Sequence, residues 1–566
     1  MKHLVRPCAP SFRVAAGATL VALAVMQSGV VTTTSEAPQP TPSPGAARPS
    51  LLVIVVVDQM RADYLTRFGA RFTGGLRRLL DEGAVYDQAH YPYLNTVTCA
   101  GHVTIGTGAL PNTHGAILNQ WYDRATARVR TCTDDPTTST YTYGRPEPSR
   151  GHSAAALRVP TLGDRLRVRT PESRVVTMSL KARSALMLAG EQATAATWLG
   201  DEHFDSTLAL GPPNPRIAAY LTANPIGAYR GEVWERLLPA DSYSGPDAGI
   251  GERPDPGWTS VFPHPLAGRS PDQYLRLWEE SPWSDAYLGR FAEAAIRDFE
   301  LGQRDAVDLL GVSFSATDLV GHSFGPDSHE VQDTVLRLDR TLGSLLATLD
   351  RVVGRDRYVL ALSADHGVAR IPEAASAAGT PAGRVPLGLV RSTAETALSA
   401  LGPGPHVARV EYTQIYLTPE TAARATATAL TPAIAALQAM PGVKAALWNK
   451  ALDGPVPGVE EATLAAVRGS YDAERSGDLS IVPLEHWFLV VGSRPDGGDA
   501  TTHGTLHAYD QHVPLIFFGR PFAAAHHTQR VTPADLAPTL ADTIALPMPG
   551  IEGRSLLGGT TPARPR

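Results

Sequence analysis

The chain has few cysteines. Only three occur among its 566 residues. Cys8 precedes an N-terminal apolar run, so it cannot be the lipid-accepting cysteine of a lipoprotein signal. Cys99 and Cys132 follow that run, and a pair of cysteines in an exported chain indicates one disulfide bond. The alternative is two buried free thiols.

The chain also lacks an excess of positive charge. Its net charge is −6, its isoelectric point is about 6.3, and no long basic run stands out. These features argue against nucleic acid as a binding partner. With 43% hydrophobic residues, the chain can form one large domain with insertions or two to three domains.

The N-terminal apolar run is short for a membrane span. Val14–Met26 comprises 13 apolar or small residues, whereas a spanning helix needs about 20. Positive residues precede the run and small polar residues follow it, which is the pattern of a secretory signal peptide. We therefore expect a signal peptide at 1–29 and export to the periplasm or the extracellular space. An uncleaved anchor is the alternative, and only then would the membrane be a partner.

Proline-rich sequence follows the expected signal peptide. Residues 30–50 have the composition of a linker that cannot form a core. We expect one large domain at 51–556 and a disordered tail at 557–566.

Apolar patterns predict an α/β fold. The continuous run Leu51–Val57 predicts a strand that is buried on both faces and ends at Asp58. Apolar residues at helical spacing predict a helix near 72–80 and a long amphipathic helix at 331–352. Further strands are predicted at 175–179, 309–314, 358–362 and 513–518. This alternation favours a layered α/β/α domain with a mostly parallel central sheet.

Two segments break the alternation. Residues 191–290 and 370–500 are rich in Pro, Gly, Trp and Tyr. We expect them to be insertions that form a cap over the edge of the sheet.

Three acidic residues lie at or just after predicted strands: Asp58, Asp318 and Asp365. In sheets of this kind, ligands gather beyond the carboxyl ends of the strands. His322 follows Asp318 by four residues, so both side chains would share one face of a helical turn. His366 follows Asp365 directly.

The segment T-H-G-T at 502–505 adds a third imidazole, His503. Each of these short patterns is weak alone, since an Asp and a His four apart are more often a helix cap and a surface residue. Together they supply three imidazoles and three carboxylates. Mixed nitrogen and oxygen ligands suit zinc, and six or seven ligands are enough for two ions.

Seven short motifs resemble one family. They are V-D-Q-M-R at 57–61, T-V-T-C-A-G-H at 96–102, H-G-A-I-L-N-Q-W-Y-D at 114–123, S-L-K-A-R at 179–183, T-D-L-V-G-H at 317–322, S-A-D-H-G at 363–367 and T-H-G-T at 502–505. In this order they resemble the alkaline phosphatase superfamily, in particular the secreted bacterial alkaline phosphatases with a threonine nucleophile. That branch belongs to the type I phosphodiesterase and nucleotide pyrophosphatase group.

The resemblance implies two zinc sites. One Zn²⁺ would be held by Asp318, His322 and His503. The second would be held by the set Asp58, Asp365, His366 and the Thr98 oxygen. Two such ions can stabilise the attacking and leaving oxygens of a phosphoryl transfer.

Thr98 would be the nucleophile, at the entry to a helix whose N-terminus favours a phosphate anion. The reaction would pass through a phosphothreonine intermediate. The alternative is that Thr98 only caps the helix. The small residues after Thr98 would let the backbone pass close to the metals. His102 and His114 receive no catalytic role, because they lie in small-residue turns where we expect backbone or packing roles. His507 and His512 receive none, because the motif match assigns only His503.

The resemblance also implies how monoesters would be preferred to diesters. Lys181 and Arg183, with Asn119, would bind the additional charged oxygen of a monoester. We therefore expect an exported di-zinc phosphatase acting on small phosphate monoesters. A nucleotide pyrophosphatase or phosphodiesterase is the first alternative, and an inactive phosphate- or metal-binding surface protein is the second. The sequence indicates neither the physiological substrate nor the oligomeric state.

Overall fold

The computed structural model describes residues 48–145, 148–492, 494 and 498–557. The expected signal peptide, nearly all of the linker and residues 558–566 of the expected tail lie outside these ranges. Within them, no helix combines the length and the apolar character that crossing a membrane requires.

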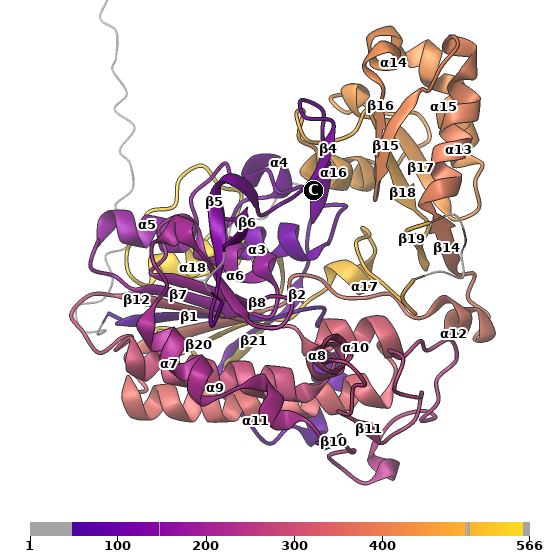
Figure 1. The fold of residues 1–566 in the computed structure, drawn as a ribbon. Coiled ribbons are helices and arrows are strands. Elements are labelled where there is room, and N and C mark those ends of the chain that lie inside the picture. The colour runs from indigo at the N-terminus through magenta and orange to yellow at the C-terminus, as the bar shows by residue number, and fades with distance from the viewer. Residues whose placement is uncertain (1–47, 146–147, 493, 495–497, 558–566) are drawn as a thin grey trace, which may run out of the picture. The chain divides into compact units, whose positions relative to one another are not determined.

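A large mixed sheet forms the centre of the described chain (Figure 1). Its eleven strands run in the spatial order β21 (Ala525–Val531), β2 (Ala84–Ala89), β20 (Leu515–Phe518), β13 (Tyr358–Ser363), β1 (Leu51–Val57), β12 (Asp308–Phe314), β7 (Val175–Ser179), β8 (Ala195–Leu199), β9 (Phe204–Thr207), β5 (Asp134–Thr142) and β6 (Ser149–His152). The five neighbours from β13 to β8 are parallel, and antiparallel pairs flank them on both sides. The predicted α/β class with a mostly parallel sheet centre is confirmed.

Helices cover both faces of this sheet (Figure 1). On one face lie α2 (Gly75–Glu82), α9 (Pro282–Asp298), α10 (Ala316–Phe324) and α11 (His329–Val352). On the other lie α3 (Thr98–Thr107), α5 (Leu162–Arg169), α6 (Ala182–Ala189) and α18 (Leu536–Asp542). The predicted long helix corresponds to α11, and the predicted layering is confirmed.

The central strand β1 is enclosed on both faces, as is typical of a parallel sheet. All seven residues of β1 are buried, and β12 and β13 pair with it on either side. Only a strand enclosed on both faces can be apolar along its whole length without exposing that surface to water. One predicted strand differs in detail: residues 513–518 contain β20, which starts at Leu515 and runs antiparallel to β13.

The first expected insertion is shorter than 191–290. Strands β8 and β9 lie inside that range but extend the central sheet, and α9 packs against α11. Their apolar runs are short and lie among Pro and Gly residues, which is why the sequence pattern suggested a cap. The remaining segment contains α7 (Pro215–Ala223), a two-stranded pair of β10 (Val233–Trp234) and β11 (His264–Pro265), and α8 (Pro271–Glu279).

The second expected insertion, 370–500, has a core of its own. A four-stranded sheet has the order β15 (Val407–Glu411), β16 (Gln414–Leu417), β18 (Leu479–Pro483) and β17 (Val443–Trp448). Helices α13 (Leu387–Leu398) and α15 (Ala427–Gln438) pack on it around a separate apolar cluster. A parallel pair of β14 (Gly383–Pro386) and β19 (Trp487–Val490) completes this part, which we call the insertion unit.

Candidate active site

The carboxyl ends of three adjacent strands bring the three aspartates together. Asp58 follows β1, and Asp365 lies two residues after β13. After β12 the chain turns directly into α10, which carries Asp318 and His322 one turn apart. Because β12 and β13 both flank β1, these side chains meet at one edge of the sheet.

Six side chains form two groups that could each hold a metal ion. The first group is Asp318, His322 and His503, and the second is Asp58, Asp365 and His366. In each group the possible ligand atoms lie within 4.8 Å of one another. The rings of His366 and His503 stack with centroids 3.4 Å apart, so the two groups adjoin. The resemblance implied the same six side chains, together with the Thr98 oxygen in the second set.

Each of the three imidazoles has one nitrogen fixed by the backbone. The Nδ1 atoms of His322, His366 and His503 lie 2.9, 3.0 and 2.9 Å from the carbonyl oxygens of Thr501, Gly367 and Thr96. A carbonyl can only accept, so Nδ1 is the donor in each ring, and in the neutral ring Nε2 keeps its lone pair. Such outer contacts orient metal-binding histidines in known sites. The three Nε2 atoms are therefore arranged as ligands.

The balance of buried charge also fits cations. Asp58, Asp318 and Asp365 are almost completely buried, and Asp58 Oδ1 has no hydrogen-bond partner among the described residues. Burial raises the pKa of Asp58 well above its ordinary value, and the carboxylates of Asp318 and Asp365 raise it further. Burial also lowers the pKa of His366 and His503, which favours the neutral rings that bind metals. The residues present thus fit divalent cations.

Thr98 is the first residue of α3 and is almost completely buried. Its Oγ1 lies 3.5 Å from His366 Nε2, at the edge of the second group. Gly101 explains how the helix comes so close: a Cβ at this position would lie 2.3 Å from the carbonyl oxygen of Asp365. The small residues after Thr98 therefore allow α3 to pack against the loop that carries Asp365 and His366.

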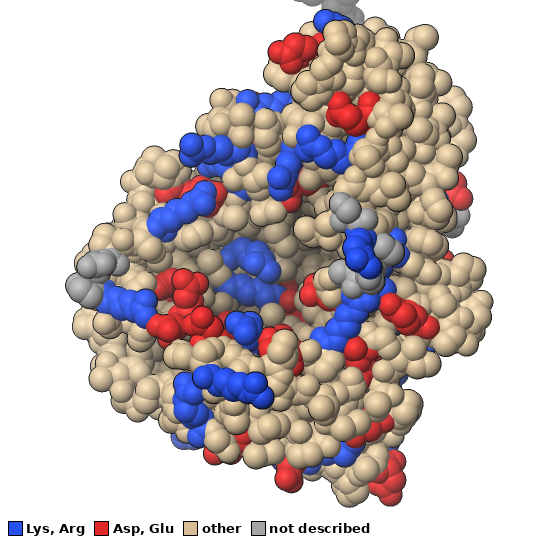
Figure 2. Space-filling model, turned by 45° about the vertical axis from the view of Figure 1, so that its right-hand side comes forward, with Lys and Arg blue, Asp and Glu red and all other residues tan. Residues whose placement is uncertain are grey.

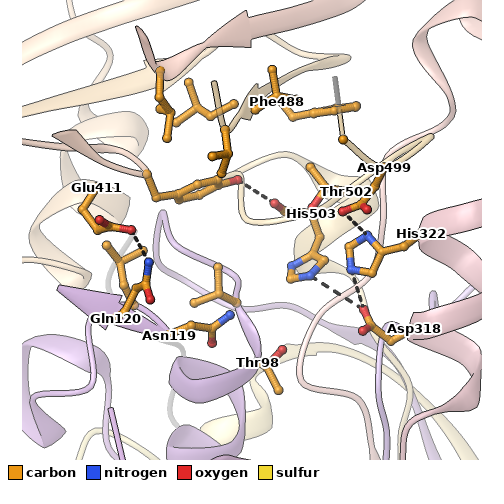
Figure 3. Close-up of a pocket in the computed structure, with 18 of the residues that line it drawn as sticks. Thr98, Asn119, Gln120, Asp318, His322, Glu411, Phe488, Asp499, Thr502 and His503 are labelled. Carbon is orange, nitrogen blue, oxygen red and sulfur yellow. Dashed lines mark hydrogen bonds and ion pairs between the residues drawn. The ribbon is translucent and has the colours of Figure 1, made fainter. Parts of the chain in front are cut away.

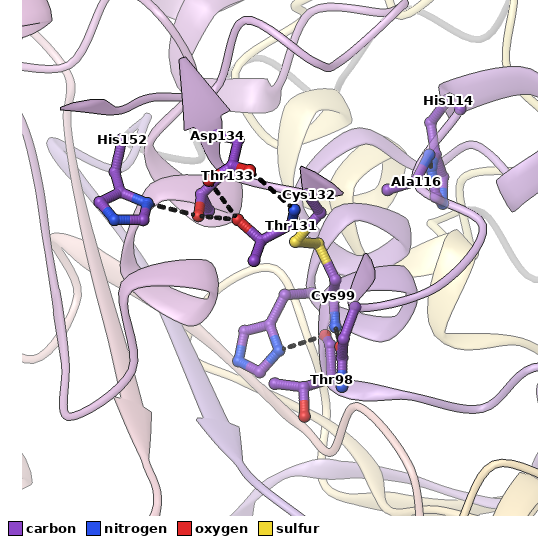
Figure 4. The surroundings of a disulfide bond; sticks show 12 residues. Thr98, Cys99, His114, Ala116, Thr131, Cys132, Thr133, Asp134 and His152 are labelled. Carbon is purple, nitrogen blue, oxygen red and sulfur yellow. Dashed lines mark hydrogen bonds between the residues drawn. A yellow bond between two sulfur atoms is a disulfide. The ribbon is translucent and has the colours of Figure 1, made fainter. Parts of the chain in front are cut away.

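Asn119 is tied to the same helix. Its Oδ1 accepts a hydrogen bond from the Cys99 backbone N–H at 2.8 Å, so its Nδ2 donors remain for a ligand. Cys132 N–H donates to the Asn119 carbonyl at 2.9 Å, and a disulfide joins Cys99 to Cys132 (Figure 4). The predicted disulfide is confirmed. It fixes the strand after Asn119 beside Thr98.

A pocket opens above Thr98 (Figure 3). It has a volume of about 430 Å³. The side chains that line it on the sheet side include Thr98, Asn119, Arg183, Asp318, His322 and His503, and the insertion unit contributes Glu411, Tyr412 and Phe488. The Nε of Arg183 is buried and has no hydrogen-bond partner among the described residues. The space-filling view shows a hollow with basic side chains at its bottom (Figure 2).

Lys181 lies between the two groups of metal-binding side chains. Its Nζ is 2.6 Å from Asp58 Oδ2 and also donates to Asp318 Oδ2, so it bridges the two groups instead of lining the pocket. Burial would lower the pKa of Lys181, but Asp318 and Asp58 raise it. Two buried carboxylates are the strongest acceptors within its reach, which explains the placement.

Sequence reasoning missed several supporting residues. Gln59 has a left-handed backbone (φ 67°) and donates through Nε2 to Asp318 Oδ1 at 2.6 Å. His102 Nδ1 is 2.8 Å from the Thr98 carbonyl and 3.2 Å from Asp365 Oδ2. His102 therefore contacts both the backbone of α3 and a carboxylate of the second metal-binding group. Both residues lie inside the quoted motifs, V-D-Q-M-R and T-V-T-C-A-G-H. Tyr412, by contrast, lies in no motif.

The layered fold and the two adjoining groups beside a buried threonine are those of the alkaline phosphatase superfamily. The model of the type I phosphodiesterase / nucleotide pyrophosphatase family matches residues 52–510, and the chain belongs to this family.

Among its relatives, the chain is similar to two bacterial alkaline phosphatases. It is 32% identical over 518 residues to alkaline phosphatase PhoV of Synechococcus elongatus, covering 89% of this chain and 91% of PhoV. It is 30% identical over 536 residues to alkaline phosphatase PafA of Elizabethkingia meningoseptica, covering 89% and 92%. The crystal structure of wild-type PafA matches with a TM-score of 0.83 at 29% identity, covering 90% of this chain and 98% of that chain.

Proposed function

We propose that this protein is an exported alkaline phosphatase that hydrolyses small phosphate monoesters with two bound Zn²⁺ ions. The observation that carries the proposal is the position of Thr98. It begins a helix, lines the pocket and lies beside the two adjoining groups of metal-binding side chains. Similarity to PhoV and PafA over about nine-tenths of the chain supports it.

The donor set supports zinc. Asp318, His322 and His503 would hold one ion, and the set Asp58, Asp365, His366 and the Thr98 oxygen would hold the other. Imidazole and carboxylate ligands in this proportion suit Zn²⁺ better than Mg²⁺ or Ca²⁺, which prefer oxygen alone. When bound, the ions would lower the pKa of the Thr98 hydroxyl and neutralise charge on the phosphoryl oxygens.

One side chain would act as the nucleophile, and others would bind the phosphoryl oxygens. The Thr98 oxygen attacks phosphorus while the bond to the leaving alcohol breaks, which gives a phosphothreonine. Water then attacks that phosphorus, releases phosphate and restores the hydroxyl. The N-terminus of α3 favours the anion, and Asn119 Nδ2, Lys181 and Arg183 would bind its oxygens.

Two alternatives remain testable. The matching family is described by phosphodiester and nucleotide pyrophosphate chemistry, so a phosphodiesterase is the second candidate. An inactive phosphate- or metal-binding protein is the third, and the complete set of ligands beside Thr98 argues against it.

The experiment compares p-nitrophenyl phosphate with its methyl diester. We expect a higher kcat/KM for the monoester, loss of nearly all turnover in Thr98→Ala and partial retention in Thr98→Ser. The matched control is Thr107→Ala, because Thr107 is buried on the same helix and its hydroxyl donates to Val103 O. Near wild-type turnover by Thr98→Ala would refute the nucleophile, and preference for the diester would favour the phosphodiesterase.

Export is part of this proposal. The N-terminal pattern of positive, apolar and small polar residues supports a signal peptide, and the Cys99–Cys132 disulfide supports an oxidising destination. The N-terminal sequence of the mature protein would identify the cleavage site near residue 29.

A further inference from the structure

The turn between β15 and β16 extends from the insertion unit into the active site. It consists of Tyr412 and Thr413 and follows Glu411, the last residue of β15, and each of these three side chains bonds to a different segment around the pocket. Gln120 Nε2 donates to Glu411 Oε1 at 2.5 Å, Tyr412 OH donates to the His503 carbonyl at 2.6 Å, and Thr413 Oγ1 donates to Asn95 Oδ1 at 2.8 Å. Figure 3 draws the first two bonds.

The three partners are next to groups that the proposed reaction uses. Gln120 follows Asn119, and Asn95 precedes Thr98 by three residues. His503 belongs to the first metal-binding group. Three consecutive residues at this turn therefore contact the segments that carry the proposed nucleophile, an oxygen-binding amide and a metal ligand.

The contact with His503 shows a close fit on both sides. Tyr412 has a positive φ of 51°, which is unusual for a residue with a side chain and stable only where surrounding contacts impose it. Opposite it, Gly504 has φ 107°, and a Cβ there would lie 2.4 Å from the Tyr412 hydroxyl. Only a glycine after His503 leaves room for the Tyr412 ring.

His503 is held from two directions as a result. Its Nδ1 donates to the Thr96 carbonyl at 2.9 Å, while its own carbonyl accepts from Tyr412. The first bond sets the orientation of the ring and the second sets the position of the backbone. Both constraints direct Nε2 toward Asp318 Oδ1, which lies 3.7 Å away.

From these contacts we propose that Tyr412 is a positioning residue for metal binding, through which the insertion unit holds His503 in place for the ion shared with Asp318 and His322. The inference rests on the proposed function, because it takes His503 to be a metal ligand. It assigns to the insertion unit a part in holding the metal, beyond covering the pocket.

The test measures zinc release from the full mature protein without substrate. Zinc-loaded wild type and Tyr412→Phe are mixed with a chelator, and the freed ion is followed with a zinc indicator. Tyr412→Phe removes one hydroxyl and keeps the ring over Gly504. Loss of one hydrogen bond should speed release of one of the two ions by roughly two- to tenfold, with the other ion unaffected. Excess zinc in the assay should restore turnover.

The matched control is Tyr416→Phe. Tyr416 lies on β16 of the same unit, and its hydroxyl also donates to a backbone carbonyl, that of Arg475 at 2.7 Å. It should release both ions at the wild-type rate. Equal release by wild type and Tyr412→Phe, or equal acceleration in both variants, would overturn the inference. A wild type that binds no zinc would instead refute the proposed function, and the inference with it.

Discussion

Replacing Arg183 by alanine should reduce monoester hydrolysis much more than diester hydrolysis. Arg183 lies in the first turn of α6 and lines the pocket, and its buried Nε has no hydrogen-bond partner among the described residues. A buried guanidinium donor without a partner is costly, so its place beside Thr98 indicates a ligand that supplies the acceptor. The transferred phosphoryl group is the candidate.

The size of the effect follows from one or two charge-assisted hydrogen bonds. Each contributes about 1.5–3 kcal/mol, which corresponds to roughly tenfold to a little over a hundredfold in rate. A diester has one fewer charged oxygen for Arg183 to bind, so its hydrolysis should decrease by a smaller factor. The measurement is kcat/KM for p-nitrophenyl phosphate and for its methyl diester, together with the zinc content of each protein.

The control for this experiment is Arg124→Ala. Arg124 is partly exposed, pairs with Asp478 at 3.2 Å and does not line the pocket. Its loss should leave both substrates unaffected. Equal decreases for monoester and diester in Arg183→Ala, with zinc retained, would refute the reasoning and leave Arg183 a general anion-binding or structural role.

Three further predictions concern metal, disulfide and pH. Chelation should abolish activity, zinc should restore it better than Mg²⁺, and elemental analysis should find about two zinc ions per chain; one Ca²⁺ in an active sample would contradict this. The double variant Cys99→Ser, Cys132→Ser should lose a few kcal/mol in the free energy of unfolding, measured by chemical denaturation, and an unchanged value would count against a stabilising bridge. Burial raises the pKa of Asp285 from 3.8 to about 7, and Asp285 Oδ1 accepts from the N–H groups of Ser315 and Ala316 at the start of α10. The stability due to this raised pKa is complete below 3.8 and is lost as the pH rises through about 7. Relative to Asp285→Asn, the wild type should therefore lose up to a few kcal/mol between pH 4 and about pH 8, and a pH-independent difference would refute this.

Much of the candidate site at the carboxyl ends of the strands could be predicted, because the sequence patterns that indicate it are local. The run Leu51–Val57 is apolar throughout and can only be a strand enclosed on both faces, so Asp58 had to lie at its end. Asp318 and His322 are one turn apart on α10, and Asp365 and His366 are adjacent. These positions follow from short patterns within single elements.

The remainder depends on contacts between distant segments. Tyr412 and His503 are 91 residues apart, and no periodicity joins them. Strands β8 and β9 are short, so only their pairing shows that they belong to the central sheet. The position of Lys181 between two carboxylates likewise depends on residues 123 and 137 positions away, which the motif could not indicate.

The Cys99–Cys132 bond makes the assembly of the site depend on the redox conditions in which the chain folds. Asn119 lies between the two cysteines, which are 33 positions apart, and it contacts the backbone N–H groups of both half-cystines. In a reducing cytosol the two thiols would stay apart, and the strand after Asn119 would be held beside Thr98 by hydrogen bonds alone. For the exported protein that we propose, full phosphatase activity would then be reached only after the chain leaves the cytosol, and the phosphorylated metabolites of the cell that makes it would be spared.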